Sequence, residues 1–196
     1  MVDALFQLGN AVNFPAIKTT LASGNELVVP LWLIAGLRTY IAVVMNSTAA
    51  ASKNHLLLFN ASGSGKVCRI WDIKANANIT AVVAGTSLVL NCARTSDQGT
   101  AGVSQTIRKS DTNDDSLPAQ ITAVSNPTSP TYTSNELASS TLLVEETAVS
   151  EGRVTLFKAD SVIAPLVLNQ GEGLGIQQGT FAGVGAINIF IYFTTD

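Results

Sequence analysis

The sequence predicts an all-β fold, a sandwich or barrel of antiparallel strands, and three observations lead to this prediction. Short segments rich in β-branched and aromatic residues recur along most of the chain, often with apolar and polar residues alternating. Clusters of Gly, Asn and Ser separate these segments, as in "NASGSG" and "NQGEG". The closing segment "GAINIFIYFTT" is mostly apolar on both faces, which is typical of a strand buried on both sides. Many short strands with such punctuation are typical of sandwiches and barrels.

The expected strands follow one another at short intervals from Arg38 onward. In chain order they cover residues 38–46, 55–60, 66–75, 78–84, 87–94, 104–111, 140–149, 152–159, 162–169, 172–179 and 185–195. One face of the last strand carries Ile187, Ile189, Ile191 and Phe193. We expect this strand to lie in the core or at a subunit contact.

Two regions interrupt the rhythm of short strands. Residues 1–37 have weak periodicity, so we expect an N-terminal arm with a first strand or a loose segment. Residues 111–139 contain three prolines and many Ser and Thr, which indicates a long loop excursion with one short strand in "QITAVS". Thr133 and Glu136 have the spacing of a capping box, which predicts a helical turn near Leu137. Residues 38–196 are then expected to form a single β-sandwich domain.

Charged residues are scarce in this chain. Asp, Glu, Lys and Arg make up 13% of the residues, roughly half of the usual share of about 25%. Ser, Thr, Asn, Gly and Ala fill the deficit, so much of the surface must be neutral. Because isolated soluble domains normally carry charges that keep copies apart, we expect part of this surface to be covered in an assembly.

Charge and hydropathy patterns also exclude several classes of partner. The net charge is −3 and the basic residues are scattered, so no basic stripe is available for the phosphate backbone of a nucleic acid. The first residues lack the basic and apolar regions of a signal peptide, and we expect a product of the cytoplasm. The longest apolar stretch, residues 27–37, is too short to cross a bilayer, so no membrane partner is expected.

The segment "NASGSGKVCRIW", residues 60–71, resembles a phosphate-binding loop but fails at both ends of that motif. Asn60 stands where the first glycine belongs, and Val67 stands where the magnesium-binding hydroxyl belongs. The residues that follow alternate with period two, whereas a phosphate-binding loop opens a helix. We therefore interpret "GSG" as a hairpin turn whose glycines supply positive φ angles.

No catalytic, cofactor-binding or metal-binding residues are assigned from the sequence. His55 is the single histidine, which removes histidine-rich metal sites, and no serine lies in a G-x-S-x-G motif. We expect His55 to be a surface or packing residue. Cys68 and Cys92 lie in strand-like segments and are interpreted as buried thiols, with one cross-strand disulfide left open. Trp71, in an alternating strand, is expected to pack.

Three further motifs do not lead to an assigned site. Asp111, Asn113 and Asp115 resemble the start of a calcium loop, but the bend glycine and the final glutamate are missing, so an Asx-rich turn is the preferred interpretation and a loose calcium site stays open. "GEGLGIQQG" fits no register of a dinucleotide-binding glycine motif. The glutamates considered as an acid pair for glycoside cleavage are interpreted as surface charge: Glu145, Glu146 and Glu151.

Two segments, "HLLLFNASGSGKVCRIWDI" and "VLNQGEGLGIQQGTFAGVGAINIFIYF", resemble jelly-roll structural proteins from the virions of tailed bacteriophages. The shared features are a strand ending in "LFN", a Ser/Gly turn, a "KVxRI" strand, a "GEGL" turn and a final strand alternating Ile with other residues. The resemblance covers residues 56–73 and 166–193. It implies a jelly-roll-like antiparallel β-sandwich without catalytic residues, often a trimer, on the capsid surface or the tail.

From these observations we expect a non-enzymatic virion protein of the capsid surface. It would be a capsid decoration or cement protein that bridges subunits of the major capsid protein, works as a homotrimer, and has no cofactor and no small-molecule substrate. Closed rings satisfy repeated heterologous contacts, which favours a trimer. The alternative is a tail-associated receptor-binding or fibre module that binds a host surface glycan. That alternative predicts an exposed cleft lined by aromatic and polar side chains.

Overall fold

A computed structural model describes residues 4–6, 16–18, 38–78, 86–134, 136–144, 152–181, 183 and 185–196. The chain divides into two units, residues 1–37 and residues 38–196. In the first unit, β1 (Ala4–Phe6) pairs antiparallel with β2 (Ala16–Lys18), so the arm carries two short strands rather than one. Within the described residues there is no helix, and hence none long and apolar enough to cross a membrane.

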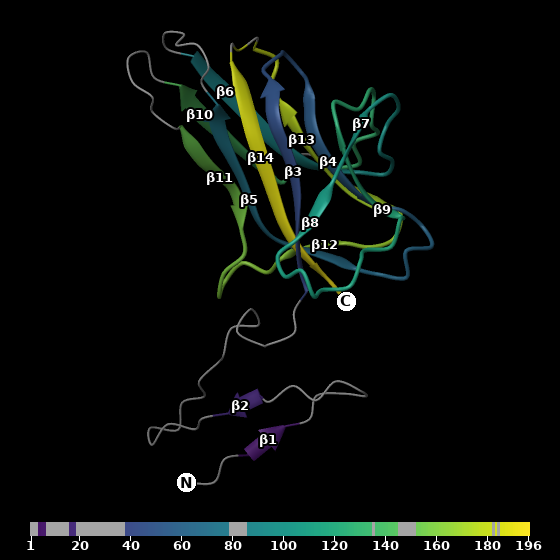
Figure 1. Ribbon diagram of the computed structural model, residues 1–196. Helices are drawn as coiled ribbons and strands as arrows, with labels where there is room; N and C mark the ends of the chain where they lie inside the picture. Colours follow the sequence, from purple (N-terminus) through teal and green to yellow (C-terminus); the bar gives the residue numbers. More distant parts are fainter. Residues whose placement is uncertain are drawn as a thin grey trace, which may run out of the picture. The chain divides into compact units, whose positions relative to one another are not determined.

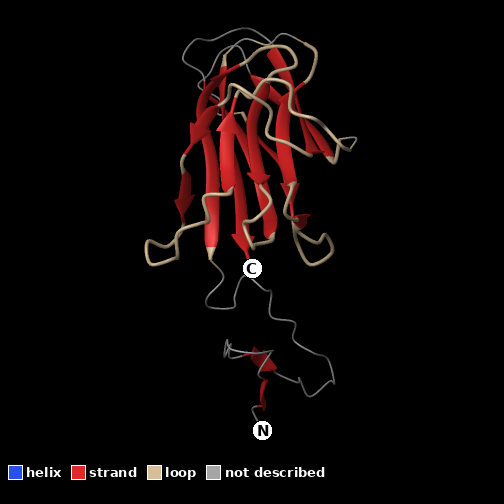
Figure 2. Cartoon of the chain, turned by 90° about the vertical axis from the view of Figure 1, so that its right-hand side faces the viewer, coloured by secondary structure: helices blue, strands red, loops and turns tan. Residues whose placement is uncertain are grey.

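The second unit consists of two antiparallel sheets (Figure 1). Sheet I has the strand order β10 (Ala138–Val144), β6 (Thr86–Thr95), β13 (Glu172–Gln178), β4 (Asn54–Asn60), β9 (Ile121–Ser125) and β7 (Val103–Gln105). Sheet II has the strand order β11 (Arg153–Lys158), β5 (Cys68–Asn78), β14 (Ala186–Thr195), β3 (Thr39–Thr48) and β8 (Ile107–Lys109). A short strand, β12 (Leu166–Leu168), also pairs with β5. Figure 2 shows that the long strands run along one common direction, with loops gathered at both ends.

The path of the chain through the two sheets is that of a jelly roll. The strands β3, β4, β5 and β6 alternate between sheet II and sheet I. The later strands β10, β11, β13 and β14 then retrace this path, pairing antiparallel with β6, β5, β4 and β3 respectively. A long antiparallel ribbon wound across two sheets in this way is a jelly-roll sandwich. The predicted fold class is therefore confirmed.

The core lies between the two sheets and is almost entirely aliphatic. The face of β14 singled out in the sequence is fully buried, as predicted for a core position: Ile187, Ile189, Ile191 and Phe193. Leu56 and Leu58 of β4 face this strand from sheet I, and the Phe193 ring lies 5.7 Å from the Tyr40 ring, centroid to centroid. Each such side chain contributes about 1.5–3 kcal/mol when removed from water, so the interior of the sandwich is the main source of stability.

The segment between β6 and β10 begins before the excursion predicted at 111–139 and is called the excursion from here on; it extends both sheets at one edge. In this region β9 pairs with β4 and β7 pairs with β9 in sheet I, whereas β8 pairs with β3 in sheet II. The strand predicted in "QITAVS" is confirmed as β9. The single strand predicted at 104–111 is wrong, because the chain passes there from one sheet to the other and splits into β7 and β8. These additions cover the edges of β3 and β4, which would otherwise be open to pairing.

Three other local predictions need correction. The segment after β4 is not a hairpin, because β4 and β5 belong to different sheets, although Gly63 (φ 86°) and Gly65 (φ 65°) do adopt the predicted positive φ. No helical turn forms near Leu137, whose amide donates to the Cys92 carbonyl as the chain enters β10. The strand predicted at 162–169 shortens to β12, because residues 159–165 form a separate loop. Residues 79–84 and 145–149, also predicted as strand, lie outside the described residues.

Candidate functional site

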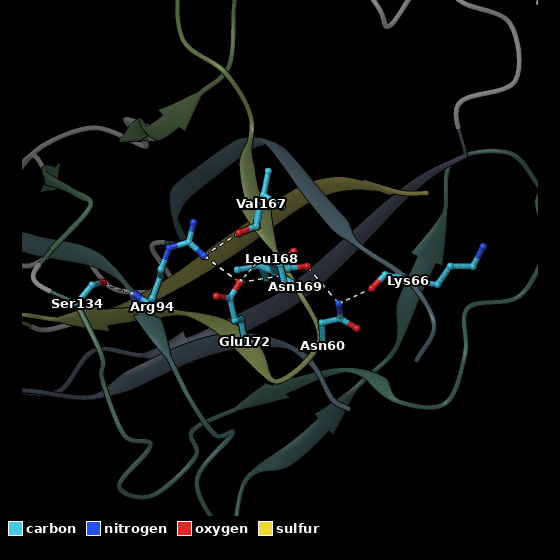
Figure 3. A network of polar contacts seen from close by, with 8 residues as sticks. All are labelled: Asn60, Lys66, Arg94, Ser134, Val167, Leu168, Asn169 and Glu172. Atoms are coloured by element: carbon cyan, nitrogen blue, oxygen red, sulfur yellow. Dashed lines mark hydrogen bonds and ion pairs between the residues drawn. The ribbon is translucent and has the colours of Figure 1, made fainter. Parts of the chain in front are cut away.

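A polar network lies at the end of the sandwich where the phosphate-loop-like segment is found (Figure 3). Arg94, at the end of β6, donates from Nη1 to the Val167 carbonyl (2.7 Å) and contacts Glu172 Oε2 (3.4 Å). The same carboxylate oxygen accepts from the Asn169 amide (2.7 Å). The groups of this network are therefore engaged with the backbone that links β12 to β13, and they fix the turn between these two strands.

Asn60 attaches the "GSGK" loop to the same region. Its Nδ2 donates to the Lys66 carbonyl (2.9 Å) and to the Leu168 carbonyl (3.1 Å). Figure 3 shows the Lys66 side chain directed away from these contacts. The loop therefore uses a buried asparagine to join two connections between strands. It lacks the helix N-terminus on which a phosphate-binding loop depends.

His55 occupies the opposite end of the core, in a buried cluster with Ser47 and Gln178. The Ser47 Oγ lies 2.7 Å from His55 Nδ1, and His55 Nε2 lies 3.2 Å from Gln178 Oε1. Since Gln178 Oε1 also accepts from the Ala50 amide, it is an acceptor, and His55 must carry its proton on Nε2. The Ser47 hydroxyl then donates to Nδ1. We call these three residues the buried polar cluster.

Two β-bulges create this cluster. In β4 the register with β13 shifts between Ile176 and Gln177, which turns His55 toward the interior next to Leu56. In β3 the register with β14 shifts in the same way, and Asn46 adopts a positive φ of 56°. That shift turns Ser47 inward. Two alternatives were predicted for His55, a surface residue or a packing residue. The second is confirmed, because the side chain is fully buried.

Ser47 and His55 have the spacing of a nucleophile and its base, but the cluster lacks access and basicity. Ser47 is 8% exposed and His55 is 0% exposed. Burial lowers the pKa of His55 to about 4, with a further lowering by the charge of Lys53. The third group is an amide, which cannot stabilise an imidazolium as a carboxylate does. We interpret the buried polar cluster as a hydrogen-bonded closure of the core.

A concave surface lies on the outer face of sheet I, where the end of the excursion crosses β6 and β13. This outer groove has a volume of about 310 Å³ and is lined by Asn91, Ala93, Tyr132, Ser134, Glu136 and Gln177. The Tyr132 ring covers Gly175, since a Cβ there would lie 2.8 Å from the Tyr132 hydroxyl oxygen. Gly175, the last glycine of "GEGLG", thus makes room for an aromatic ring.

The polar groups of the outer groove are held in place by their neighbours. Glu136 Oε1 accepts from Asn91 Nδ2 (2.9 Å), and Asn91 Oδ1 accepts from the Ser139 hydroxyl (2.8 Å). The Tyr132 hydroxyl donates to Asn54 Oδ1 (2.6 Å), and burial raises the pKa of Tyr132 to about 12. An oriented carboxylate, two amides and a ring edge are groups that can bind a neutral polyhydroxylated ligand. No feature of the sequence pointed to this groove.

A second concavity, the edge pocket, lies beside β8 and β9. It has a volume of about 350 Å³, and its apolar wall includes Ile107, Leu117, Pro118 and Ile121. Lys109 lines its rim and donates to the Asp114 carbonyl (2.7 Å). The excursion therefore covers this edge of the sandwich and also forms a pocket there.

The Asp111 segment forms the Asx turn that the sequence predicts. Asp111 Oδ1 accepts from the Asn113 amide (2.9 Å), while Asp115 forms an ion pair with Arg38. The two carboxylates among the possible calcium ligands thus have separate partners, and across the described parts of the chain no three His, Cys, Asp or Glu side chains converge as metal ligands.

The two cysteines and Trp71 are packing residues of the sandwich. Cys68 and Cys92 are free and buried, as predicted, and burial raises the pKa of each thiol to about 12. The Trp71 indole packs half-buried and donates to the Thr194 hydroxyl (2.9 Å). Glu145, Glu146 and Glu151 lie outside the described residues.

Comparisons with known proteins add no assignment. No protein-family model matches the chain, and no significant match was found among curated proteins or solved structures.

Proposed function

We propose that this protein is a non-enzymatic structural protein of a bacteriophage virion, a capsid decoration or cement protein that bridges major capsid protein subunits as an oligomer. One observation carries the proposal. Large apolar side chains stand exposed on a surface with few charges, among them Val162 (89% exposed), Phe181 (77%) and Val103 (62%). Contiguous exposed apolar patches mark interaction surfaces, and Val162 is followed on the same loop by Ile163, which is 50% exposed.

The jelly-roll fold and the sequence resemblance support the same proposal. Both sheets are completed by the excursion at one edge, while β10 and β11 remain the outer strands at the other. Edge strands favour pairing with further chains unless they are covered. A cement protein would cover such surfaces by standing on the shell between subunits and by contacting its own copies.

The test combines a mass measurement with shell binding. Light scattering of the purified protein is expected to give three times the 20.4 kDa chain mass. Mixed with empty heads assembled from the major capsid protein of the same phage, the oligomer is expected to sediment with the particles and raise their melting temperature. The proposal is contradicted if the purified protein does not sediment with the heads, whether it is a trimer or a single chain.

The outer groove favours one second candidate, a receptor-binding module that binds a neutral glycan of the host surface. The oriented Glu136 carboxylate would accept hydrogen bonds from two sugar hydroxyls, and the amide groups of Asn91 and Gln177 would add both donors and acceptors. Protein–carbohydrate contacts of this kind depend on convergent polar groups beside an aromatic ring.

For this candidate, Glu136→Gln is expected to weaken binding to purified host surface polysaccharide at least tenfold, as measured by calorimetry. The reason is that the amide keeps the shape of the side chain but loses one acceptor site and its charge, and a hydrogen bond to a charged group contributes about 1.5–3 kcal/mol. Asp111→Asn is the matched control, because asparagine preserves the Asx turn far from the groove. Absence of binding by the unaltered protein would exclude this second function.

A further inference from the structure

We propose that the loop between β11 and β12 of one copy inserts into the edge pocket of a second copy, and that repetition of this contact closes a ring. The inference rests on the proposed function, since it names the surfaces through which copies of the oligomer would associate. Four features of the described body support it: an exposed apolar tip, a pocket with an apolar wall, their positions on opposite edges, and their equal height along the strands.

The apolar tip consists of Val162 and Ile163, which are 89% and 50% exposed. Asp160 holds the tip in one conformation, because its Oδ1 accepts from the Val162 amide (2.7 Å) and from the Ile163 amide (2.8 Å). The Asp160 amide in turn donates to the Ile163 carbonyl (3.0 Å). Two aliphatic side chains are thus presented to solvent by a turn that needs little further ordering on binding, and such preorganisation favours association.

The edge pocket offers the complementary surface. Its apolar wall, described above, comes from β8, β9 and the loop between them, and its rim carries the ammonium group of Lys109. The loop that bears the tip carries the carboxylate of Asp160, which its backbone hydrogen bonds keep ionised. Opposite charges beside an apolar contact favour one orientation of the partners and disfavour others.

The tip and the pocket lie on opposite edges of the sandwich. β11 and β12 occupy one edge of sheet II, and β8 occupies the other. Figure 1 shows the loop after β11 and the loop after β8 at the same end of the body. The three strands β5, β14 and β3 lie between them, and the four spacings between strands give a width of about 20 Å. The tip of one chain therefore cannot reach its own pocket, and a second copy is the occupant that this placement fits.

A row of paired residues shows that the apolar tip and the edge pocket lie at the same height along the strands. Across sheet II, Leu166 pairs with Ile70, Ile70 with Phe193, Phe193 with Tyr40, and Tyr40 with Lys109. The row begins beside the tip and ends at the rim of the pocket. A contact between surfaces at equal height needs little translation along the strands. A heterologous contact of this kind closes into a ring when the rotations between neighbouring copies add up to one full turn, whereas a contact that does not close forms a filament.

The first test is an engineered disulfide between the two surfaces. In the double variant Val162→Cys with Ala119→Cys, the second position lines the pocket and is exposed. Because a disulfide requires Cα atoms within about 7 Å, oxidation can join these positions only between copies. The native thiols are buried and do not compete. We expect a ladder of linked chains on a denaturing gel that ends at the ring size of three. Absence of cross-links, or a ladder that continues without limit, would overturn the inference.

The second test removes the tip. The variant Val162→Ser with Ile163→Ser should lower the light-scattering mass threefold, to that of a single chain. A cooperative melting transition of this monomeric variant will show that it is folded. Ala119→Trp, which fills the pocket from its exposed rim, should have the same effect. Met45→Ser is the control, since it removes an apolar side chain of β3 that is 50% exposed, as Ile163 is.

The two proposals are distinguishable in this experiment. An unchanged oligomeric mass in the tip variant rejects the tip-to-pocket contact. If that oligomer still sediments with empty heads, the proposed function stands without this contact. Failure of the unaltered oligomer to bind heads, together with the expected cross-links, rejects the proposed function but retains the ring.

Discussion

Lowering the pH from 7 to 4.5 is expected to reduce the free energy of unfolding by about 2.5 kcal/mol through His55 alone. The side chain is fully buried, and burial is the largest cause of its low pKa of about 4 in the folded protein. In the unfolded chain the pKa of a histidine returns to about 6.5. As the pH falls below that value, the unfolded state binds a proton that the folded state does not.

The direction of the effect follows from this difference in proton binding. The stabilising contribution of neutral His55 is fully present above pH of about 6.5 and is lost as the pH falls toward about 4. The hydrogen bond from Ser47 acts in the same sense, because its hydroxyl donates to Nδ1 and would have to reverse if that nitrogen were protonated, whereas the hydrogen bond to Gln178 favours the protonated ring and opposes the shift. Urea unfolding at a series of pH values measures the effect.

The matched control for this prediction is His55→Gln. It removes the single histidine of the chain, so the loss of stability between pH 7 and pH 4.5 should largely disappear even if the variant is less stable at every pH. The pKa of Asp97 is lowered by hydrogen bonds from the Thr131 side chain and from backbone amides, and that of Asp160 by backbone amides, so their contributions are lost only below the ordinary carboxyl range. An equal pH dependence in both proteins would contradict the buried, neutral state of His55.

The strands and the fold class could be predicted from local patterns, because the core face of each long strand repeats with period two. The face of β14 with Ile187 and Ile191 is the clearest case, and it lies at the centre of sheet II. The connection after β4 was misinterpreted as a hairpin because its glycines look the same in a hairpin and in a crossing between sheets. Which strand pairs with which is a long-range property that a turn sequence does not specify.

The buried polar cluster could not be predicted, because it depends on two β-bulges. Strict alternation would place His55 and Leu56 on opposite faces of β4, and the bulge opposite Gln177 places both inside. The sequence around Ser47 likewise gives no sign that Asn46 adopts a positive φ. The outer groove was missed for a related reason, since it forms where residues 132–136 cross strands that lie far from them in sequence.

The substitution Gly173→Ala is expected to lower the free energy of unfolding by about 1–3 kcal/mol, the range for overpacking a filled site. Gly173 lies on the outer face of β13, between Phe59 of β4 and Thr95 of β6. A Cβ at this position would lie 2.4 Å from Thr95 Oγ1, 2.7 Å from Phe59 Cδ2 and 3.0 Å from the Leu58 carbonyl oxygen. Because that carbonyl belongs to the sheet backbone, the strand itself must move.

The comparison that tests the steric argument is Gly179→Ala, measured by urea unfolding beside Gly173→Ala. A Cβ at Gly179 would meet Val89 at 3.4 Å, which is ordinary contact, so its stability should change by less than about 0.5 kcal/mol. Both changes add the same methyl group and remove the same backbone freedom from the unfolded chain. If the two variants lost equal stability, close packing over β13 would not be the reason for glycine there. A selective loss at Gly173 would establish that the neighbouring strands leave no room for a Cβ at this position of the "GEGLG" segment.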